Sequence, residues 1–423
     1  MTQSHSGYRE FRRGWPIVLA SMLGVGLGLS PMPFYTIGVF APHLHQEFGW
    51  GMGEIFFGIT ITTFVMLVAG PLAGFLSSRY GPRPVALLSL FLFSLAFMSF
   101  ALSNGSLQLY YLAWGAMALV GAGTLPITWT HGVNSWFEQR KGLALGLALS
   151  GTGLFGITSK PLTAWMIESF GWRGAYIGLG LMPLLIALPV AYVLFRNTNG
   201  DPQSPVSAKR HIDGLTFKET LRSWRLWLMV IAFVPISFAL GGPIPNMENI
   251  LKANHFSMSE IMQLTPFIGL SALIGRLVGG WLLDRFWAPA VALVILISPA
   301  IACWLLTQGN MGFGIAVISI CLIGFAVGVE YDLMAFLAAK YFGMRSYSQT
   351  YTLLYVCFSI GAGFGPALFG WSFDRHGGYS GILTISSFLL VVSAMCFLAL
   401  GRYRNETTEE VESPANTAHL ART

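Results

Sequence analysis

The sequence predicts an all-α membrane protein, with twelve transmembrane helices in two pseudo-symmetric six-helix bundles. Hydrophobic residues make up 54% of the 423 residues and charged residues only 10%, whereas a soluble domain carries about 25% charge. Apolar runs of roughly 20 residues, the length that crosses a bilayer, recur along the chain between short polar breaks. The longest polar break, 196–225, divides these runs six and six.

The apolar runs place the helices in chain order. The first run follows directly on the charged segment 8–13 with no evident cleavage site, so we expect it to be retained as a first helix. The helices of the first half are expected at 15–40, 54–77, 84–103, 108–134, 142–169 and 174–195. Those of the second half are expected at 226–250, 260–283, 288–308, 311–337, 346–372 and 380–401.

Lys and Arg residues are distributed unevenly between the two sides of this arrangement. If the N-terminus is cytoplasmic, most of the 24 Lys and Arg residues fall in inner segments, and only Arg173, Lys252 and Arg375 fall in outer loops. The positive-inside rule then predicts that both termini are cytoplasmic, in a cytoplasmic (inner) membrane. The formal charge of +6 is therefore a topology signal and does not indicate a nucleic-acid partner. The chain divides into halves at 1–195 and 226–404, a cytoplasmic linker at 196–225, and a polar tail at 405–423 that we expect to be disordered.

A similar motif ends the second predicted helix of each half. Residues 74–83 read GFLSSRYGPR and residues 280–285 read GWLLDR, so both contain Gly-x-Leu-x-(Asp/Ser)-Arg. This motif resembles the cytoplasmic loop motif of the major facilitator superfamily, and the resemblance covers nearly the whole chain. It implies a major facilitator fold and a cytoplasmic latch between neighbouring helices. The latch residues would be Arg79, Arg83, Asp284 and Arg285.

A narrower resemblance lies around the fourth and fifth predicted helices. Residues 136–151 read WFEQRKGLALGLALSG, which resembles the corresponding stretch of monocarboxylate transporters and of bacterial oxalate–formate exchangers. Segments 35–40 and 47–50 add a further match at the end of the first predicted helix. Gly142, Gly146 and Ser150 form one small-residue face that favours close helix packing. The resemblance implies that the substrate is a small organic anion, with a monocarboxylate expected.

Two basic residues fall inside predicted helices, where a charge costs ~2.5–3.5 kcal/mol on insertion scales. The pattern around Arg276 resembles the eighth-helix arginine of monocarboxylate carriers, which in that family faces the cavity and holds the carboxylate. A guanidinium binds a carboxylate through two parallel hydrogen bonds and keeps its proton. The alternative for Arg276 is a structural ion pair with the predicted helix 311–337. For Lys160, we consider either snorkelling to the outer interface or attraction of anions in the cavity.

Glu330 and Asp332 lie in the predicted helix 311–337. They point about 200° apart, so both cannot face one partner. One is expected to pair with Arg276 or to meet the cavity, and the other to brace the inner gate with Lys340 or Arg345. A buried carboxylate near an arginine is also a candidate site for a coupling proton.

Further candidates come from the predicted helices that line the cavity in the resembling superfamily. For Tyr35, Tyr351 and Tyr355, substrate contact and core packing stay open as alternatives. Proline-containing interruptions at 31–33 and 242–246 occupy equivalent positions in the two halves, which points to a binding or gating region and makes Asn246 a candidate substrate contact. His131 is interpreted either as a proton relay or as a hydrogen-bonded residue at the membrane interface.

The sequence contains no nucleotide-binding loop motif, no metal-ligand cluster and no nucleophile triad. We therefore expect no enzyme, no metal and no cofactor, and we interpret the four cysteines as buried thiols. The function predicted is secondary transport of a small organic anion, with proton coupling left open. The partners are the substrate and the lipid bilayer, and the sequence is compatible with a monomer. The alternatives are an efflux carrier for lipophilic compounds and a non-transporting membrane receptor.

Overall fold

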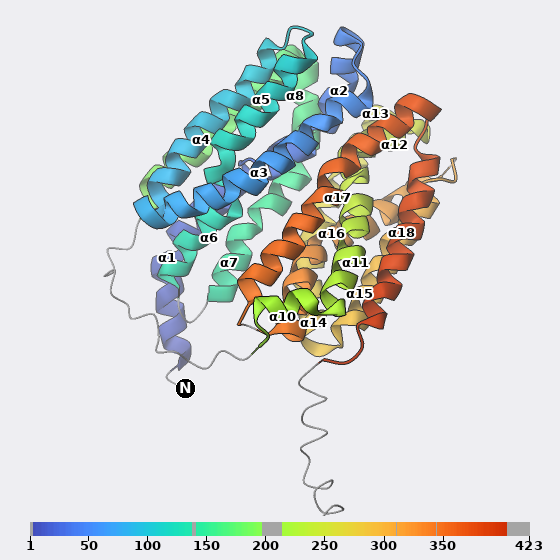
Figure 1. The fold of residues 1–423 in the computed structure, drawn as a ribbon. Helices are drawn as coiled ribbons and strands as arrows, with labels where there is room; N and C mark the ends of the chain where they lie inside the picture. Colours follow the sequence, from blue (N-terminus) through green and yellow to red (C-terminus); the bar gives the residue numbers. More distant parts are fainter. Residues whose placement is uncertain (1–2, 138–140, 197–213, 310, 344, 404–423) are drawn as a thin grey trace, which may run out of the picture.

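The computed structural model describes residues 3–137, 141–196, 214–309, 311–343 and 345–403. These residues form α-helices with short 3₁₀ and π segments and no β-strand, apart from one isolated bridge. The helices stand in two groups side by side, coloured blue to green and lime to red in Figure 1. The predicted all-α class is confirmed.

The first half contains six membrane crossings. The first three are built from α1 (Gln3–Gly26) with α2 (Pro31–Phe48), α3 (Met52–Tyr80), and α4 (Pro82–Met98) with η1 (Ser99–Leu102). The fourth consists of α5 (Leu107–Gly121), η2 (Ala122–Thr124) and α6 (Pro126–Trp136). The last two are built from α7 (Lys141–Leu149), α8 (Gly151–Met182), η3 (Pro183–Ala187) and α9 (Leu188–Leu194).

The helix α8 changes direction at Gly171, whose φ of 72° and ψ of 168° are not helical. A positive φ at this turn favours glycine, which has no Cβ to clash with the backbone. The apolar run around it, Ala144–Leu194, has 51 residues and would extend ~76 Å as one straight helix, far beyond the ~30 Å of a hydrocarbon core. Both α7 and α9 pack against α1, so the chain turns back and crosses twice. The 11 candidate spans of the described residues therefore give the twelve predicted crossings.

The second half repeats this plan. Its crossings are α11 (Trp224–Gly241) with α12 (Pro243–Ala253), α13 (Met258–Leu264) with α14 (Pro266–Arg285), α15 (Ala288–Leu305), α16 (Phe313–Phe342), α17 (Tyr347–His376) and α18 (Ser380–Ala399). The short helix α10 (Phe217–Arg222), capped by the Thr216 side chain, lies inside the expected linker. The rest of that linker at 197–213 and the predicted tail at 405–423 lie outside the described residues.

Proline explains where the first crossing of each half breaks. Pro31 opens α2 and Pro243 opens α12, each in the first turn of its helix. Proline has no N–H to donate, and the first turn of a helix is where that donor is not needed. The breaks therefore lie at equivalent positions in the two halves, as the sequence indicated.

Among the described residues, the two halves touch mainly where α3 packs on α17, α8 on α14, and α2 on α12, and α8 also contacts α13. We name the end that carries Arg79 and Asp284 the basic end, and the end that carries Gly171 and Gly377 the far end. The Thr60 hydroxyl donates to Gly363 O at 2.5 Å, and Phe64 packs on Phe364 with ring centroids 5.5 Å apart. All of these residues lie in the far-end parts of α3 and α17.

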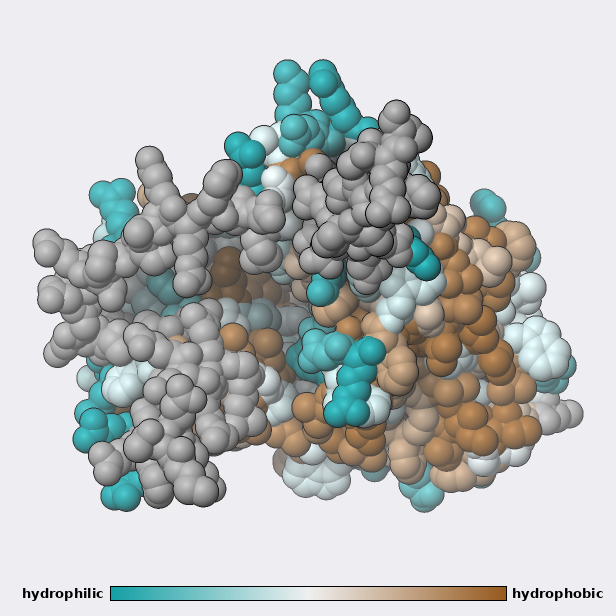
Figure 2. All heavy atoms as spheres, turned by 90° about the horizontal axis from the view of Figure 1, so that it is seen from below, coloured by the Kyte–Doolittle hydropathy of each residue, from teal (hydrophilic) through white to brown (hydrophobic). Residues whose placement is uncertain are grey.

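The halves separate toward the basic end. Within the described residues, α6 and α7 have no packing against the second half comparable to that of α3 or α8. The view from below in Figure 2 shows a recess between the halves, with apolar and polar atoms in its depth. The far end is therefore closed and the basic end open in this conformation.

Candidate functional site

Arg276 lies on α14 at the centre of the region between the halves. The preceding residue, Gly275, packs so closely on α16 that an added Cβ would overlap Phe325 O, and this contact sets the position of the arginine. The positive charge of Arg276 acts on Glu330 and Asp332 of α16 and on Tyr35 of α2. In the described part of the chain, no carboxylate lies within 4.0 Å of its guanidinium. The alternative of an ion pair with helix α16 is not realised in this conformation.

The two carboxylates of α16 lie within electrostatic reach of this arginine and differ in burial. Glu330 is 8% exposed, and its Oε2 atom has no hydrogen-bond partner among the described residues. Asp332 is half-buried. The expected brace with Lys340 is not formed, because the Lys340 ammonium lies over the Phe336 ring at 5.6 Å and makes no ion pair in the described structure. Glu330 Oε2 thus keeps its capacity to accept a hydrogen bond from a ligand.

Tyrosines form a ladder along one face of α17. Tyr347, Tyr351 and Tyr355 are four residues apart, with ring centroids 5.9 and 6.5 Å apart and planes at 22°. Tyr331 of α16 joins them, 6.2 Å from Tyr355. Tyr331 and Tyr347 were not among the predicted site residues, although the i, i+4 spacing on one helix was a signal for Tyr347. The ladder gives the site a wall of aromatic faces and hydroxyl groups.

Lys160 is fully buried, so the structure excludes the snorkelling arrangement. Its ammonium lies 2.5 Å from Glu248 Oε1 and donates to Ile244 O at 3.0 Å. Lys160 belongs to α8 in the first half, whereas Glu248 belongs to α12 in the second. Glu248 was not among the predicted site residues, although a carboxylate inside the predicted helix 226–250 was a signal for it.

The glycines of α8 fix the order of these groups along the molecule. Gly156 meets Gly269 of α14, and an added Cβ at Gly156 would lie 3.2 Å from the Tyr35 ring. Lys160 lies about one helical turn from Gly156 toward the far end, and Arg276 lies about two turns from Gly269 toward the basic end. Along the molecule, the Lys160–Glu248 pair therefore lies nearest the far end, Tyr35 follows it, and Arg276 lies nearest the open basic end.

Comparisons with known proteins agree with this architecture. The family model of the Major Facilitator Superfamily matches residues 23–366. The chain belongs to the major facilitator superfamily. Monocarboxylate transporter 11 of Mus musculus is 25% identical, over 95% of this chain and 90% of the relative. An uncharacterized 38 kDa protein of Thermoproteus tenax is 28% identical, over 87% of this chain and 91% of that protein.

The fold is also shared with a solved structure. A bacterial homologue of the human lysosomal transporter Spinster, in an inward-facing and unoccupied conformation, superposes with a TM-score of 0.72 at 16% identity. The match covers 92% of this chain and 96% of the other. The family and the candidate membrane spans of the described residues identify an integral membrane transporter, which points to transport rather than to catalysis.

Asn246, predicted as a substrate contact, makes its hydrogen bonds within the protein in this conformation. Its side chain is fully buried. The amide Nδ2 donates to Gly242 O at 2.9 Å and to Pro366 O at 3.1 Å, and its oxygen accepts from the Tyr379 hydroxyl at 3.5 Å. With both amide hydrogens used inside the protein, Asn246 connects the start of α12 to α17 and α18.

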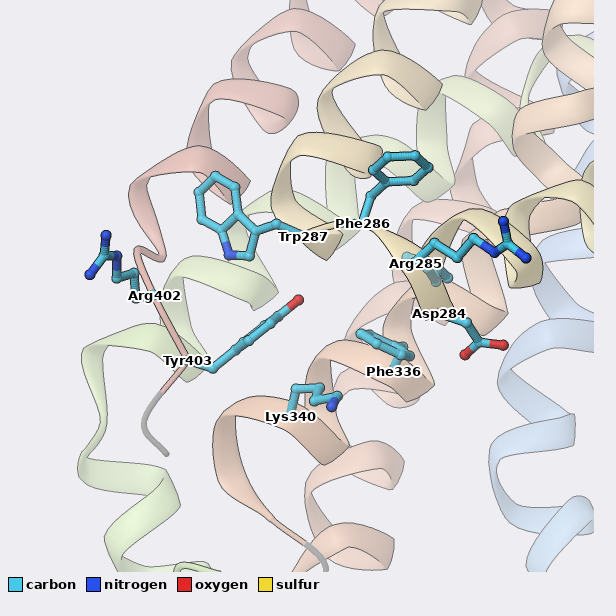
Figure 3. A pocket seen from close by; sticks show the side chains of 9 residues that line it. Asp284, Arg285, Phe286, Trp287, Phe336, Lys340, Arg402 and Tyr403 are labelled. Atoms are coloured by element: carbon cyan, nitrogen blue, oxygen red, sulfur yellow. The ribbon is translucent and has the colours of Figure 1, made fainter. Parts of the chain in front are cut away.

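The predicted latch is only partly formed at the open basic end. Arg83 donates to Tyr192 O at 2.6 Å and so joins the start of α4 to the end of α9. Arg79 is exposed, over the Tyr80 ring at 5.5 Å, and His131 is exposed on α6. Asp284 makes no ion pair within the described residues. With Arg285 it borders a recess of about 470 Å³, completed by Leu283, Phe286, Trp287, Phe336, Lys340, Arg402 and Tyr403 (Figure 3).

The four cysteines differ in exposure. Cys303 is buried as predicted, whereas Cys321, Cys357 and Cys396 are partly exposed, contrary to the prediction of buried thiols. Among the described residues, no group of three or more His, Cys, Asp or Glu side chains is placed to hold a metal ion.

Proposed function

We propose that this facilitator is a secondary active transporter that moves a small organic anion, a monocarboxylate, across the cytoplasmic membrane by alternating access. The basic end faces the cytoplasm in this proposal, in keeping with the concentration of Lys and Arg residues there. The observation that carries the proposal is Arg276, a guanidinium between the halves that has no carboxylate within 4.0 Å among the described residues. The monocarboxylate transporters among its relatives support the same substrate class.

Arg276 supplies what a carboxylate ligand needs. Its planar fork donates two parallel hydrogen bonds to the two carboxylate oxygens. The hydroxyl groups of Tyr351 and Tyr355, on the tyrosine ladder, are additional donors for the same ligand. The aromatic faces of the ladder suit the apolar body of a small organic acid.

The carboxylates beside Arg276 provide a reason for proton coupling. Glu330 and Asp332 both lie within electrostatic reach of the arginine, so an incoming anion meets two negative charges as well as one positive charge. A proton bound at Glu330 removes one of the repulsive charges and adds a donor. Proton and anion then favour each other's binding, which is the thermodynamic requirement for symport.

An efflux carrier for lipophilic compounds is the second candidate function. It is favoured by the buried Glu330 oxygen that lacks a hydrogen-bond partner in the described structure, because a carboxylate beside an aromatic wall suits a lipophilic cation. In that case Arg276 would serve to hold the carboxylates of α16 in place and would not contact the ligand.

A thermal-stability screen of the purified protein in detergent separates the two functions. The panel contains short monocarboxylates, aromatic acids, dicarboxylates and lipophilic cations. A ligand at 100 times its Kd stabilises the folded state by ~2.7 kcal/mol. We expect stabilisation by monocarboxylates or aromatic acids, and we expect Arg276→Gln to abolish it while Arg79→Gln, an exposed arginine outside the site, leaves it intact. Stabilisation by cations alone, or an unchanged response in Arg276→Gln, would reject the anion assignment.

A further inference from the structure

The ion pair between Lys160 and Glu248 joins the two halves inside the protein. Their side chains are 0% and 4% exposed, with 2.5 Å between Nζ and Oε1. The Lys160 ammonium has a second acceptor in Ile244 O at 3.0 Å, which also belongs to α12. Separating α8 from α12 would therefore break both interactions at the same time.

Close backbone packing supports the pair from the neighbouring helix. Gly38 of α2 approaches α12 so tightly that an added Cβ would overlap Pro245 O and the Glu248 carboxylate. The first half therefore holds Glu248 from two sides, with α8 supplying the charge and α2 the packing surface. This arrangement exists only while the far ends of the two halves are in contact.

A small cavity lies on the outer side of the pair. It measures about 190 Å³ and lies between α2, α12 and α13. Its polar lining consists of His43, Gln46, Glu248, Asn249 and Lys252. Glu248 both lines this cavity and pairs with Lys160, so a slight separation of the halves at this point would bring water to both charges.

Because the pair is desolvated, the free-energy cost of removing one of its charges depends on whether the far end is closed or open. A buried charge is tolerated only when it is paired, and removing one partner leaves the other unsolvated. Once the far end opens, water solvates each charge separately. Removing one partner therefore costs little free energy in the conformation whose far end is open. We propose that Lys160 and Glu248 form the gate of the far end. The two side chains are paired in the conformation whose basic end is open, and they separate when the far end opens.

This inference rests on the chain working by alternating access, and it does not depend on the identity of the substrate. It also revises the expectation for Lys160. In the conformation seen here its charge is balanced by Glu248, and it becomes available to an anion only when the far end opens. Lys160 is in this sense a positioning residue of the cycle and not a permanent part of the anion site.

Cysteine labelling of the purified protein in detergent, with no substrate present, measures how often the far end opens. Val39 is buried and borders the small cavity, so Val39→Cys in a background with the four native cysteines replaced by alanine serves as the reporter. The rate of reaction with a maleimide follows the open population. We expect Glu248→Gln and Lys160→Met each to raise this rate at least ~10-fold, which corresponds to 1.4 kcal/mol.

Two further variants make the result specific. The charge reversal Lys160→Glu with Glu248→Lys restores the pair and should bring the rate back toward that of the parent. Glu47→Gln is the matched control, because the Glu47–Arg173 pair at 2.7 Å lies at the same end but is exposed and lies within the first half. This control should label like the parent.

The inference is overturned if the single variants label at the parental rate, or if the charge reversal labels as fast as they do. Should Glu248→Gln or Lys160→Met fail to fold, Glu248→Asp serves instead, since it keeps the charge but retracts the carboxylate by one methylene. We expect an intermediate rise in its labelling, and a parental rate would again overturn the gate. Since the assay contains no substrate, a failed anion screen leaves this test unaffected.

Discussion

Replacing Gly269 by alanine tests how closely the two halves must meet on the far-end side of the site. Gly269 of α14 faces α8, and an added Cβ would overlap backbone atoms of Gly156 and Ile157 and lie 2.7 Å from Gly153 O. These obstacles are helix backbone and not the ends of flexible side chains, so no change of rotamer relieves the overlap. The two helices would have to move apart at the point where the closed far end begins.

The magnitude follows from two opposing effects. Overpacking of a well-packed contact costs about 1–3 kcal/mol, while alanine is favoured over glycine inside a helix by about 1 kcal/mol. The matched control is Gly280 on the same helix, where an added Cβ meets nothing within 4 Å. Gly280→Ala should therefore gain the helix preference without the overlap, and Gly269→Ala should be less stable than it by about 1–3 kcal/mol.

Thermal unfolding of the two variants in detergent, followed by circular dichroism, measures this difference. The control removes effects of helix propensity, since both substitutions are Gly→Ala in α14. Equal stability of Gly269→Ala and Gly280→Ala would refute the close α8–α14 contact. Because opening of the far end relieves the overlap, Gly269→Ala should also raise labelling of the Val39→Cys reporter.

Three more substitutions have defined outcomes. Asp374→Asn weakens the bonds that its carboxylate accepts from the amides of Met52 and Gly53 at 2.9 and 2.8 Å, and should raise far-end labelling severalfold. Arg83→Gln removes the link to Tyr192 O and should lower stability by about 1 kcal/mol without altering ligand-induced stabilisation. Glu330→Gln should retain exchange of labelled anion in proteoliposomes but lose net transport driven by a pH gradient.

The fold was predictable because membrane crossings are local features of the sequence. A run of roughly 20 apolar residues and a proline at a helix start need no information about distant partners. The main deviation is the first crossing, predicted to end at 40 but continuing in α2 to Phe48. The polar residues near Glu47 are typical of a loop, which is why the predicted helix ended before them. Contacts with Arg173 at 2.7 Å and Trp172 at 2.6 Å, both far away in the sequence, hold Glu47 in place.

The site was only partly predictable, because partners across the two halves leave no local pattern. The sequence places Lys160 inside a helix, but its burial and its pairing depend on how α8 meets α12. Asn246 was singled out for its position in a helix break, whereas its hydrogen bonds to Gly242 and Pro366 depend on the packing of α17. Arg276 could be predicted from the sequence, because an arginine inside a membrane helix is costly and indicates a functional residue even when its partner is unknown.

The charges inside the membrane-spanning helices of this carrier fall into two groups that reflect its conformation. Lys160 and Glu248 are paired where the halves touch, whereas Arg276 and Glu330 form no ion pair where the halves separate, in the described structure. Charges without a protein partner need water or a ligand, which the open basic end admits. When that end closes, Arg276 must pair with a carried carboxylate or with a carboxylate of α16. If Glu330 is that internal partner, the empty carrier can return only while Glu330 is present, and this is why Glu330→Gln should separate exchange from net transport.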